Sequence, residues 1–83
     1  MENNNNYISQ NEELQQKFID TIHEAYKTHE GFGWFGSVLG VLPNCYAKGY
    51  IECKLNALVT ETKSREVIKI SMLEWAKYDI WKQ

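Results

Sequence analysis

An amphipathic pattern with the period of an α-helix follows the polar N-terminus of the chain. The apolar side chains that share one side of its helical wheel are Leu14, Phe18, Ile19, Ile22, Ala25 and Tyr26. Ser9 and Glu12 form a capping box ahead of this stripe, and Gly31 after it can adopt the left-handed conformation that ends a helix. The pattern therefore predicts one amphipathic helix over residues 9–30.

The residues ahead of this helix are mostly polar. Met1 is followed by a glutamate and four consecutive asparagines, a composition that offers almost nothing to bury. A chain of 83 residues supports only one core. We therefore predict a disordered polar tail over residues 1–8 and a single folded domain over residues 9–83.

Residues 46–60 alternate between apolar or small side chains and polar ones. The first kind comprises Ala47, Gly49, Ile51, Cys53, Leu55, Ala57 and Val59. A period of two is typical of a β-strand with one buried face. The many small residues on that face indicate that a helix or a second backbone approaches it closely.

A second alternating run, at residues 67–72, predicts a partner for this strand. The polar connector ETKSRE separates the two runs, and an antiparallel pairing of them matches apolar side chains with apolar ones. A competing pattern starts at Ser71 and Glu74, which form a second capping box and would begin a C-terminal helix. We favour the strand and leave both conformations open for residues 72–83.

A further strand, loosened by glycine, is predicted over residues 34–42. Pro43 and Asn44 would then turn the chain into the long strand that follows. The predicted fold class is α+β, with the N-terminal amphipathic helix packed on a small antiparallel β-meander of about three strands. The C-terminal segment completes this fold as a strand or as a short helix.

The charge balance excludes some classes of partner. Nine Lys and Arg residues against 11 Asp and Glu residues give a net charge of -2, which provides no basic footprint for nucleic acid. The longest nearly uncharged apolar run, residues 31–43, is too short to span a bilayer, and no secretory signal pattern precedes it. We therefore expect a cytoplasmic protein without nucleic-acid or membrane partners.

The stretch GFGWFG places Gly31, Gly33 and Gly36 in the spacing of a dinucleotide-binding loop. Such a loop follows a strand and opens a helix, whereas here a helix precedes the glycines. The bulky Trp34 and Phe35 also fill the space that a phosphate would need. We interpret the glycines as permitting a sharp re-entry of the chain, and we expect no nucleotide-binding fold.

The two cysteines and two histidines do not form a metal or catalytic site by their spacing. Cys45 and Cys53 lack the C-x-x-C pattern, and His23 and His29 lie on different sides of the predicted helix. A disulfide between the cysteines requires Gly49 to sit at a hairpin turn, and this pairing stays open. We expect no metal, no cofactor and no enzymatic activity.

Aromatic residues exceed what the predicted core can hold. The chain carries three Trp, five Tyr and three Phe residues, and the C-terminal segment has two apolar sides in either conformation. Buried Trp and Tyr anchors dominate the energetics of protein interfaces. We therefore predict a partner-binding surface that consists of Trp34, Phe35, Leu73, Trp75 and Trp81. In the alternative, the loop of residues 32–42 covers these side chains within one chain.

The leading hypothesis is a small non-enzymatic interaction module, a homodimer that binds a protein partner. Its short, asparagine-rich and lysine-rich chain would suit an inhibitor encoded by a phage or another mobile element. The alternative is a binder of a planar, nucleotide-like compound, held between helix and sheet by Tyr26, His29, Tyr50 and Tyr78. A small enzyme that uses the same pocket is a second alternative.

Overall fold

The computed structural model describes the backbone of residues 2–81 and the side chains of residues 12–81. Its elements are α1 (Glu2–Thr28), α2 (Trp34–Leu39), α3 (Tyr46–Glu61), α4 (Arg65–Trp75) and the 3-10 helix η1 (Asp79–Trp81). No β-strand occurs in this range. The predicted α+β fold with its antiparallel meander is therefore wrong, and the chain forms a small all-helical domain.

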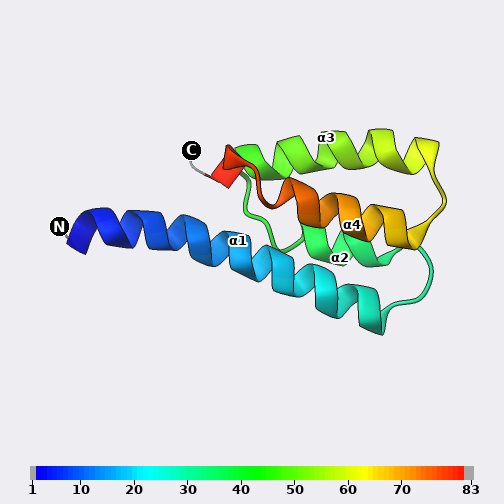
Figure 1. The fold of residues 1–83 in the computed structure, drawn as a ribbon, viewed down its shortest axis with the longest axis horizontal. Coiled ribbons are helices and arrows are strands. Elements are labelled where there is room, and N and C mark those ends of the chain that lie inside the picture. Colours follow the sequence, from blue (N-terminus) through cyan, green and yellow to red (C-terminus); the bar gives the residue numbers. More distant parts are fainter. Residues whose placement is uncertain (1, 82–83) are drawn as a thin grey trace.

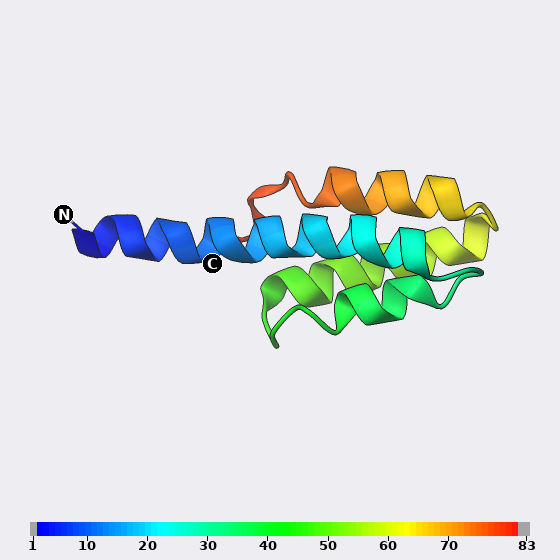
Figure 2. The same cartoon turned by 90° about the horizontal axis from the view of Figure 1, so that it is seen from below.

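α1 contacts α2, α4 and η1, while α3 packs against α4 and η1. Figure 1 shows α1 and α4 running in opposite directions, with α3 beyond α4. In the view from below, α4 lies along one side of α1 and α2 along another (Figure 2). The first turns of α1 project past the other helices in both views.

One hydrophobic core lies between these helices. The side chains that are fully enclosed come from α1, α2, α3 and α4: Phe18, Ile22, Trp34, Val38, Ile51, Ile68 and Met72. Ile80 and Trp81 of η1 close the same core from the C-terminal side. Every element of the bundle therefore contributes at least one buried apolar side chain.

The predicted first helix and its glycine cap are confirmed. α1 ends at Thr28, and Gly31 follows with a φ of 78°, the left-handed conformation that favours glycine. The helix begins at Glu2, although the sequence predicted a polar tail before Ser9. No glycine or proline interrupts residues 2–28, and each asparagine costs a helix only about 0.7 kcal/mol relative to alanine.

The predicted long strand is the helix α3. Its buried residues Ala47, Ile51 and Leu55 are four apart, so they belong equally to an alternating pattern and to one face of a helix. The two patterns differ at the intervening Gly49 and Cys53, which the strand would bury and which the helix exposes. The alternation was real, but it could not distinguish the two conformations at the positions that are buried.

The predicted second strand and C-terminal strand are also wrong, because this part of the chain forms α4. Its N-cap is Ser64, whose hydroxyl accepts a hydrogen bond from the backbone N–H of Val67 at 3.3 Å. Ile68 and Met72 are buried, whereas Ile70, which the strand would have placed between them in the core, is exposed. The competing C-terminal helix is correct only for residues 71–75, because α4 starts before Ser71 and ends at Trp75, and a turn and the 3-10 helix η1 follow.

The third predicted strand, over residues 34–42, contains the short helix α2. Its buried side chains are Trp34 and Val38, and the buried Leu42 follows at the same spacing of four residues. Gly33 and Gly40 bound the helix at its two ends. Gly33 and Gly40 therefore mark the limits of this helix, while Gly36 lies inside it.

Two buried tryptophans differ in how their indole N–H groups are satisfied. Trp81 donates to the backbone oxygen of Ala76 at 2.8 Å, and the side-chain amide of Gln15 donates to the same oxygen. The N–H of Trp34 is buried and has no hydrogen-bond partner among the described residues. A buried donor without a partner costs about 1–3 kcal/mol.

Replacing each of these tryptophans by phenylalanine should therefore have unequal effects on stability. Trp34→Phe removes an unpaired donor along with part of a ring, whereas Trp81→Phe removes a formed hydrogen bond. We expect Trp81→Phe to lower the free energy of unfolding by about 1–2 kcal/mol more than Trp34→Phe does. Urea unfolding followed by circular dichroism measures this difference, and equal losses would show that the Trp34 N–H is paired.

Candidate functional site

The predicted partner-binding residues lie mostly inside the bundle. Trp34, Trp75 and Trp81 are only 0%, 8% and 5% exposed, while Phe35 and Leu73 are partly buried against the core. The reasoning that one chain could not enclose all three indoles is therefore wrong. The partner-binding role of these five residues stays a prediction, but three of them offer almost no surface to a partner.

The four predicted ligand-binding residues divide into two groups. Tyr50 and Tyr78 lie together, with their ring centroids 5.9 Å apart. Tyr26 and His29 contact Arg65 at the start of α4, whereas Tyr78 follows the end of that helix. The structure therefore brings two of the four residues into one cluster and leaves the other two at the opposite end of α4.

The group at the start of α4 ties three segments together. Arg65 donates from Nε to the carbonyl oxygen of Gly31 at 2.7 Å and from Nη2 to those of Tyr26 and His29 at 2.9 and 2.5 Å. Its guanidinium carbon also lies 4.3 Å from the centroid of the Tyr26 ring. This arrangement, the Arg65 clasp, satisfies carbonyls left unpaired at the end of α1 and complements the helix dipole.

The hydroxyl of Tyr26 extends the clasp to the next residue of α4. It donates to Oε1 of Glu66 at 2.6 Å. This hydrogen bond, together with desolvation and the charge of Glu66, raises the pKa of Tyr26 above its ordinary value of 10.0. The protonated phenol therefore contributes stability that is complete below pH 10 and is lost as the pH rises through the raised pKa.

Three tyrosines form a separate cluster at the other end of α4. Tyr46 and Tyr50 are four residues apart on α3 and so share one of its faces, and Tyr78 packs against Tyr50 from the turn before η1. Tyr46 and Tyr78 are about half exposed, and Tyr50 is partly buried. We call Tyr46, Tyr50 and Tyr78 the tyrosine cluster.

Lysines and a shallow hollow accompany the tyrosine cluster. The ammonium of Lys54 lies 5.8 Å from the Tyr50 ring centroid. The hollow measures about 540 Å³ and is lined by Tyr46, Lys77, Tyr78, Asp79 and Ile80. This part of the surface therefore combines aromatic faces, hydroxyl groups and cations within reach of one another.

The outward side of α3 beside the cluster carries no charged side chain. The exposed residues directly opposite its buried face are Gly49, Cys53, Asn56, Ala57 and Thr60, and the exposed Glu52, Lys54 and Glu61 border them. The solvent side of a surface helix is ordinarily charged. An uncharged side made of small residues allows another chain to approach this helix closely.

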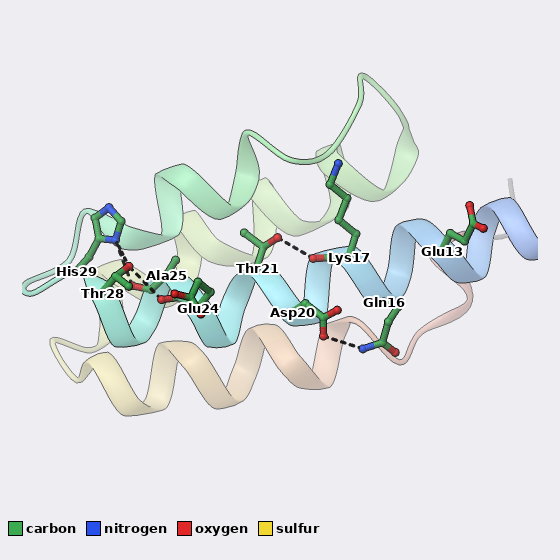
Figure 3. Close-up of a pocket in the computed structure, with 9 residues that line it drawn as sticks. All are labelled: Glu13, Gln16, Lys17, Asp20, Thr21, Glu24, Ala25, Thr28 and His29. Carbon is green, nitrogen blue, oxygen red and sulfur yellow. Dashed lines mark hydrogen bonds between the residues drawn. The ribbon is translucent and has the colours of Figure 1, made fainter.

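Another hollow lies along α1 and measures about 620 Å³. Figure 3 shows that its side chains come from successive turns of that one helix. Several of them bond within α1: Gln16 donates to Asp20 at 2.9 Å, and the hydroxyl of Thr21 donates to the Lys17 carbonyl at 2.7 Å. These polar groups form an ordinary solvated helix face and no catalytic constellation.

Cysteines and acidic residues do not combine into a metal site in the described part of the chain. No group of three or more His, Cys, Asp or Glu residues could hold a metal ion there. Cys45 and Cys53 are both free thiols, which answers the open question of their pairing for this structure. Over residues 2–81, no helix has both the length and the hydropathy to cross a bilayer.

No family model, curated protein or solved structure matches this chain. Two of the three residues of the tyrosine cluster, Tyr50 and Tyr78, belong to the predicted ligand-binding set, and Tyr46 does not. Its spacing of four from Tyr50 would have placed the two rings together if the segment had been recognised as a helix.

The Arg65 clasp should depend on the forked shape of the guanidinium. We expect Arg65→Ala to lower the free energy of unfolding by about 2 kcal/mol or more, because the carbonyls that end α1 lose their donor. Arg65→Lys should recover less than half of this loss, since one ammonium cannot reach three carbonyls. Chemical unfolding measures both, with the exposed Lys63→Ala as the control. Full recovery by lysine would contradict this account.

Proposed function

We propose that this chain is a small non-enzymatic interaction module that binds a partner protein through the tyrosine cluster. The observation that carries the proposal is the convergence of Tyr46, Tyr50 and Tyr78 on one exposed area from two separate segments. Tyrosine supplies a large contact area with few rotatable bonds and a hydroxyl that can donate or accept. Such residues are enriched where proteins meet.

The rings are partly held in place before any partner binds. Tyr50 contacts Tyr78 at 5.9 Å, and its backbone belongs to a helix of four turns. Ordering a free side chain at an interface costs about 0.5–1.5 kcal/mol. A cluster that is already packed avoids part of this cost, which favours its use for recognition.

The surroundings indicate the chemistry of the partner. The uncharged outer side of α3 can accept a closely packed segment such as a helix, and the exposed charges that border it are of both signs, namely Glu52, Lys54 and Glu61. The proposed partner is therefore a protein that presents a helix with small or apolar residues.

A small planar ligand is a second candidate for the same surface. The hollow of about 540 Å³ between Tyr46 and Tyr78 falls in the size range of ligand sites. An aromatic ring could stack there on a tyrosine, and Lys77 could hold an anionic group. This candidate retains Tyr50 and Tyr78 from the predicted ligand set and replaces the other two residues by Tyr46 and Lys77.

A double variant, Tyr46→Ala with Tyr78→Ala, should separate binding from folding. Both side chains are about half exposed, so we expect only a small change in the free energy of unfolding, about 1 kcal/mol or less. Capture of partner proteins from the native host should fall by roughly tenfold or more, because central tyrosines are typical binding hot spots. The control is His23→Ala with Lys27→Ala, two exposed positions on α1.

The same variants distinguish the ligand from the protein partner. In a thermal-shift panel of nucleotides and planar metabolites, a true ligand at about 100 times its dissociation constant stabilises the wild type by roughly 2.7 kcal/mol. The tyrosine variant should lose that shift. If the tyrosine variant captures a partner as well as the wild type does, the tyrosine cluster is not the binding surface.

A further inference from the structure

A smaller hollow lies at the end of the bundle where the loop after α1 meets the connector between α3 and α4. It measures about 200 Å³ and is lined by Phe32, Phe35, Val59, Thr62 and Lys63. Figures 1 and 2 both show this loop and this connector at the same end of the molecule. We call the five lining residues the phenylalanine pocket.

The walls of the phenylalanine pocket are apolar. Phe32 is 39% exposed, while Phe35 and Val59 are partly buried against the core. An apolar cavity of about 150 Å³ is large enough to hold one benzene molecule. The pocket therefore has room for one aromatic ring or one branched aliphatic group.

Two polar side chains of the pocket can bind a further group. Lys63 is exposed, and its ammonium takes part in no hydrogen bond or ion pair within the described part of the chain. The hydroxyl of Thr62 accepts from the backbone N–H of Ser64 at 3.1 Å, so its own proton can still be donated. The adjacent Glu61 is exposed and does not line the pocket. A cation and a hydroxyl donor on neighbouring residues favour a carboxylate.

The Arg65 clasp joins the two segments that form the phenylalanine pocket. Arg65 directly follows the connector, and it donates to the carbonyl oxygen of Gly31, the residue before Phe32, at 2.7 Å. Phe35 packs on the buried Trp34, with the two ring centroids 6.1 Å apart. The walls are therefore held in place before a ligand binds, which lowers the cost of binding.

We propose that the phenylalanine pocket binds a small apolar carboxylate, a free compound that carries one carboxylate and either one aromatic ring or one branched aliphatic chain. The apolar group lies against the two phenylalanines and Val59. The carboxylate accepts a hydrogen bond from the Thr62 hydroxyl and pairs with the ammonium of Lys63. The pocket shares no residue with the tyrosine cluster, so this proposal does not depend on the proposed function.

Titration with sodium phenylacetate, followed by two-dimensional NMR of the backbone amides, tests the site. A compound of about ten non-hydrogen atoms should bind with a dissociation constant on the order of 1 mM. The amide signals that shift should be those of the phenylalanine pocket and its neighbours in the chain. Two control compounds each keep half of the chemistry: acetate lacks the ring, and 2-phenylethylamine carries an ammonium in place of the carboxylate. Each should bind at least about fivefold more weakly.

Single substitutions separate the apolar part of the site from the charged part. We expect Phe32→Ala to weaken phenylacetate binding by about fivefold or more, because the ring loses an apolar wall. Lys63→Gln should weaken it by about threefold, since an exposed ion pair contributes modestly. Lys63→Glu should reverse the preference and bind 2-phenylethylamine more tightly than phenylacetate. Lys17→Gln, the same loss of charge at an exposed position of α1, should leave binding unchanged.

Both substituted side chains are exposed, so the variants should fold, and circular dichroism checks this. The absence of a saturable shift at phenylacetate concentrations on the order of 10 mM would overturn the proposal. Equal binding of 2-phenylethylamine by the wild type would show that the charge of the ligand is not recognised, and would overturn it too. If a tripeptide that ends in phenylalanine binds at least about tenfold more tightly than phenylacetate, the site receives a polypeptide terminus and no free ligand.

The two proposed sites can fail separately. The double variant Tyr46→Ala with Tyr78→Ala should bind phenylacetate as the wild type does, because neither tyrosine lines the phenylalanine pocket. A loss of phenylacetate binding in this variant, with the fold intact, would contradict the assignment of the ligand to the pocket. The result for partner capture has no bearing on this titration.

Discussion

The contact between Arg65 and the end of α1 holds the bundle in register. One guanidinium donates to the carbonyl oxygens of Tyr26, His29 and Gly31, so it joins α1, the loop after it and the start of α4. At the other end of α4, the Ala76 carbonyl accepts from Gln15 of α1 and from Trp81 of η1. On α1 the two contact points are Gln15 and Tyr26, and on the α4 side they are Ala76 and Arg65. The separation along the chain is the same in both pairs, as antiparallel packing in register requires.

The distribution of aromatic residues follows from this framework. The indoles of Trp75 and Trp81 are buried, and the ring of Phe18 in α1 lies 5.5 Å from that of Trp81. Tyr46 and Tyr78 of the tyrosine cluster are instead about half exposed. The three tryptophans, from which the sequence predicted an interface, therefore lie in the core. The tyrosine cluster supplies exposed aromatic surface.

Sequence reasoning succeeded where the pattern was unambiguous. The stripe of α1 and the left-handed Gly31 were predicted correctly, because a period of 3.6 over many residues has no competing interpretation. It failed for α3, because Ala47, Ile51 and Leu55 satisfy both periods. The same error explains why the tyrosine cluster was not predicted. On a helix, Tyr46 and Tyr50 are neighbours, whereas on a strand they lie on the same face but are separated by two repeats of the pleat.

The attachment of α4 at both ends has a consequence for local opening. A helix held at one end can fray from the other, but α4 would have to release Arg65 and the Ala76 carbonyl to separate from α1. Backbone amides of these two helices should therefore exchange with solvent deuterium as one cooperative unit. The first turns of α1, which project past the other helices, lie outside that unit and are free to exchange independently (Figure 2).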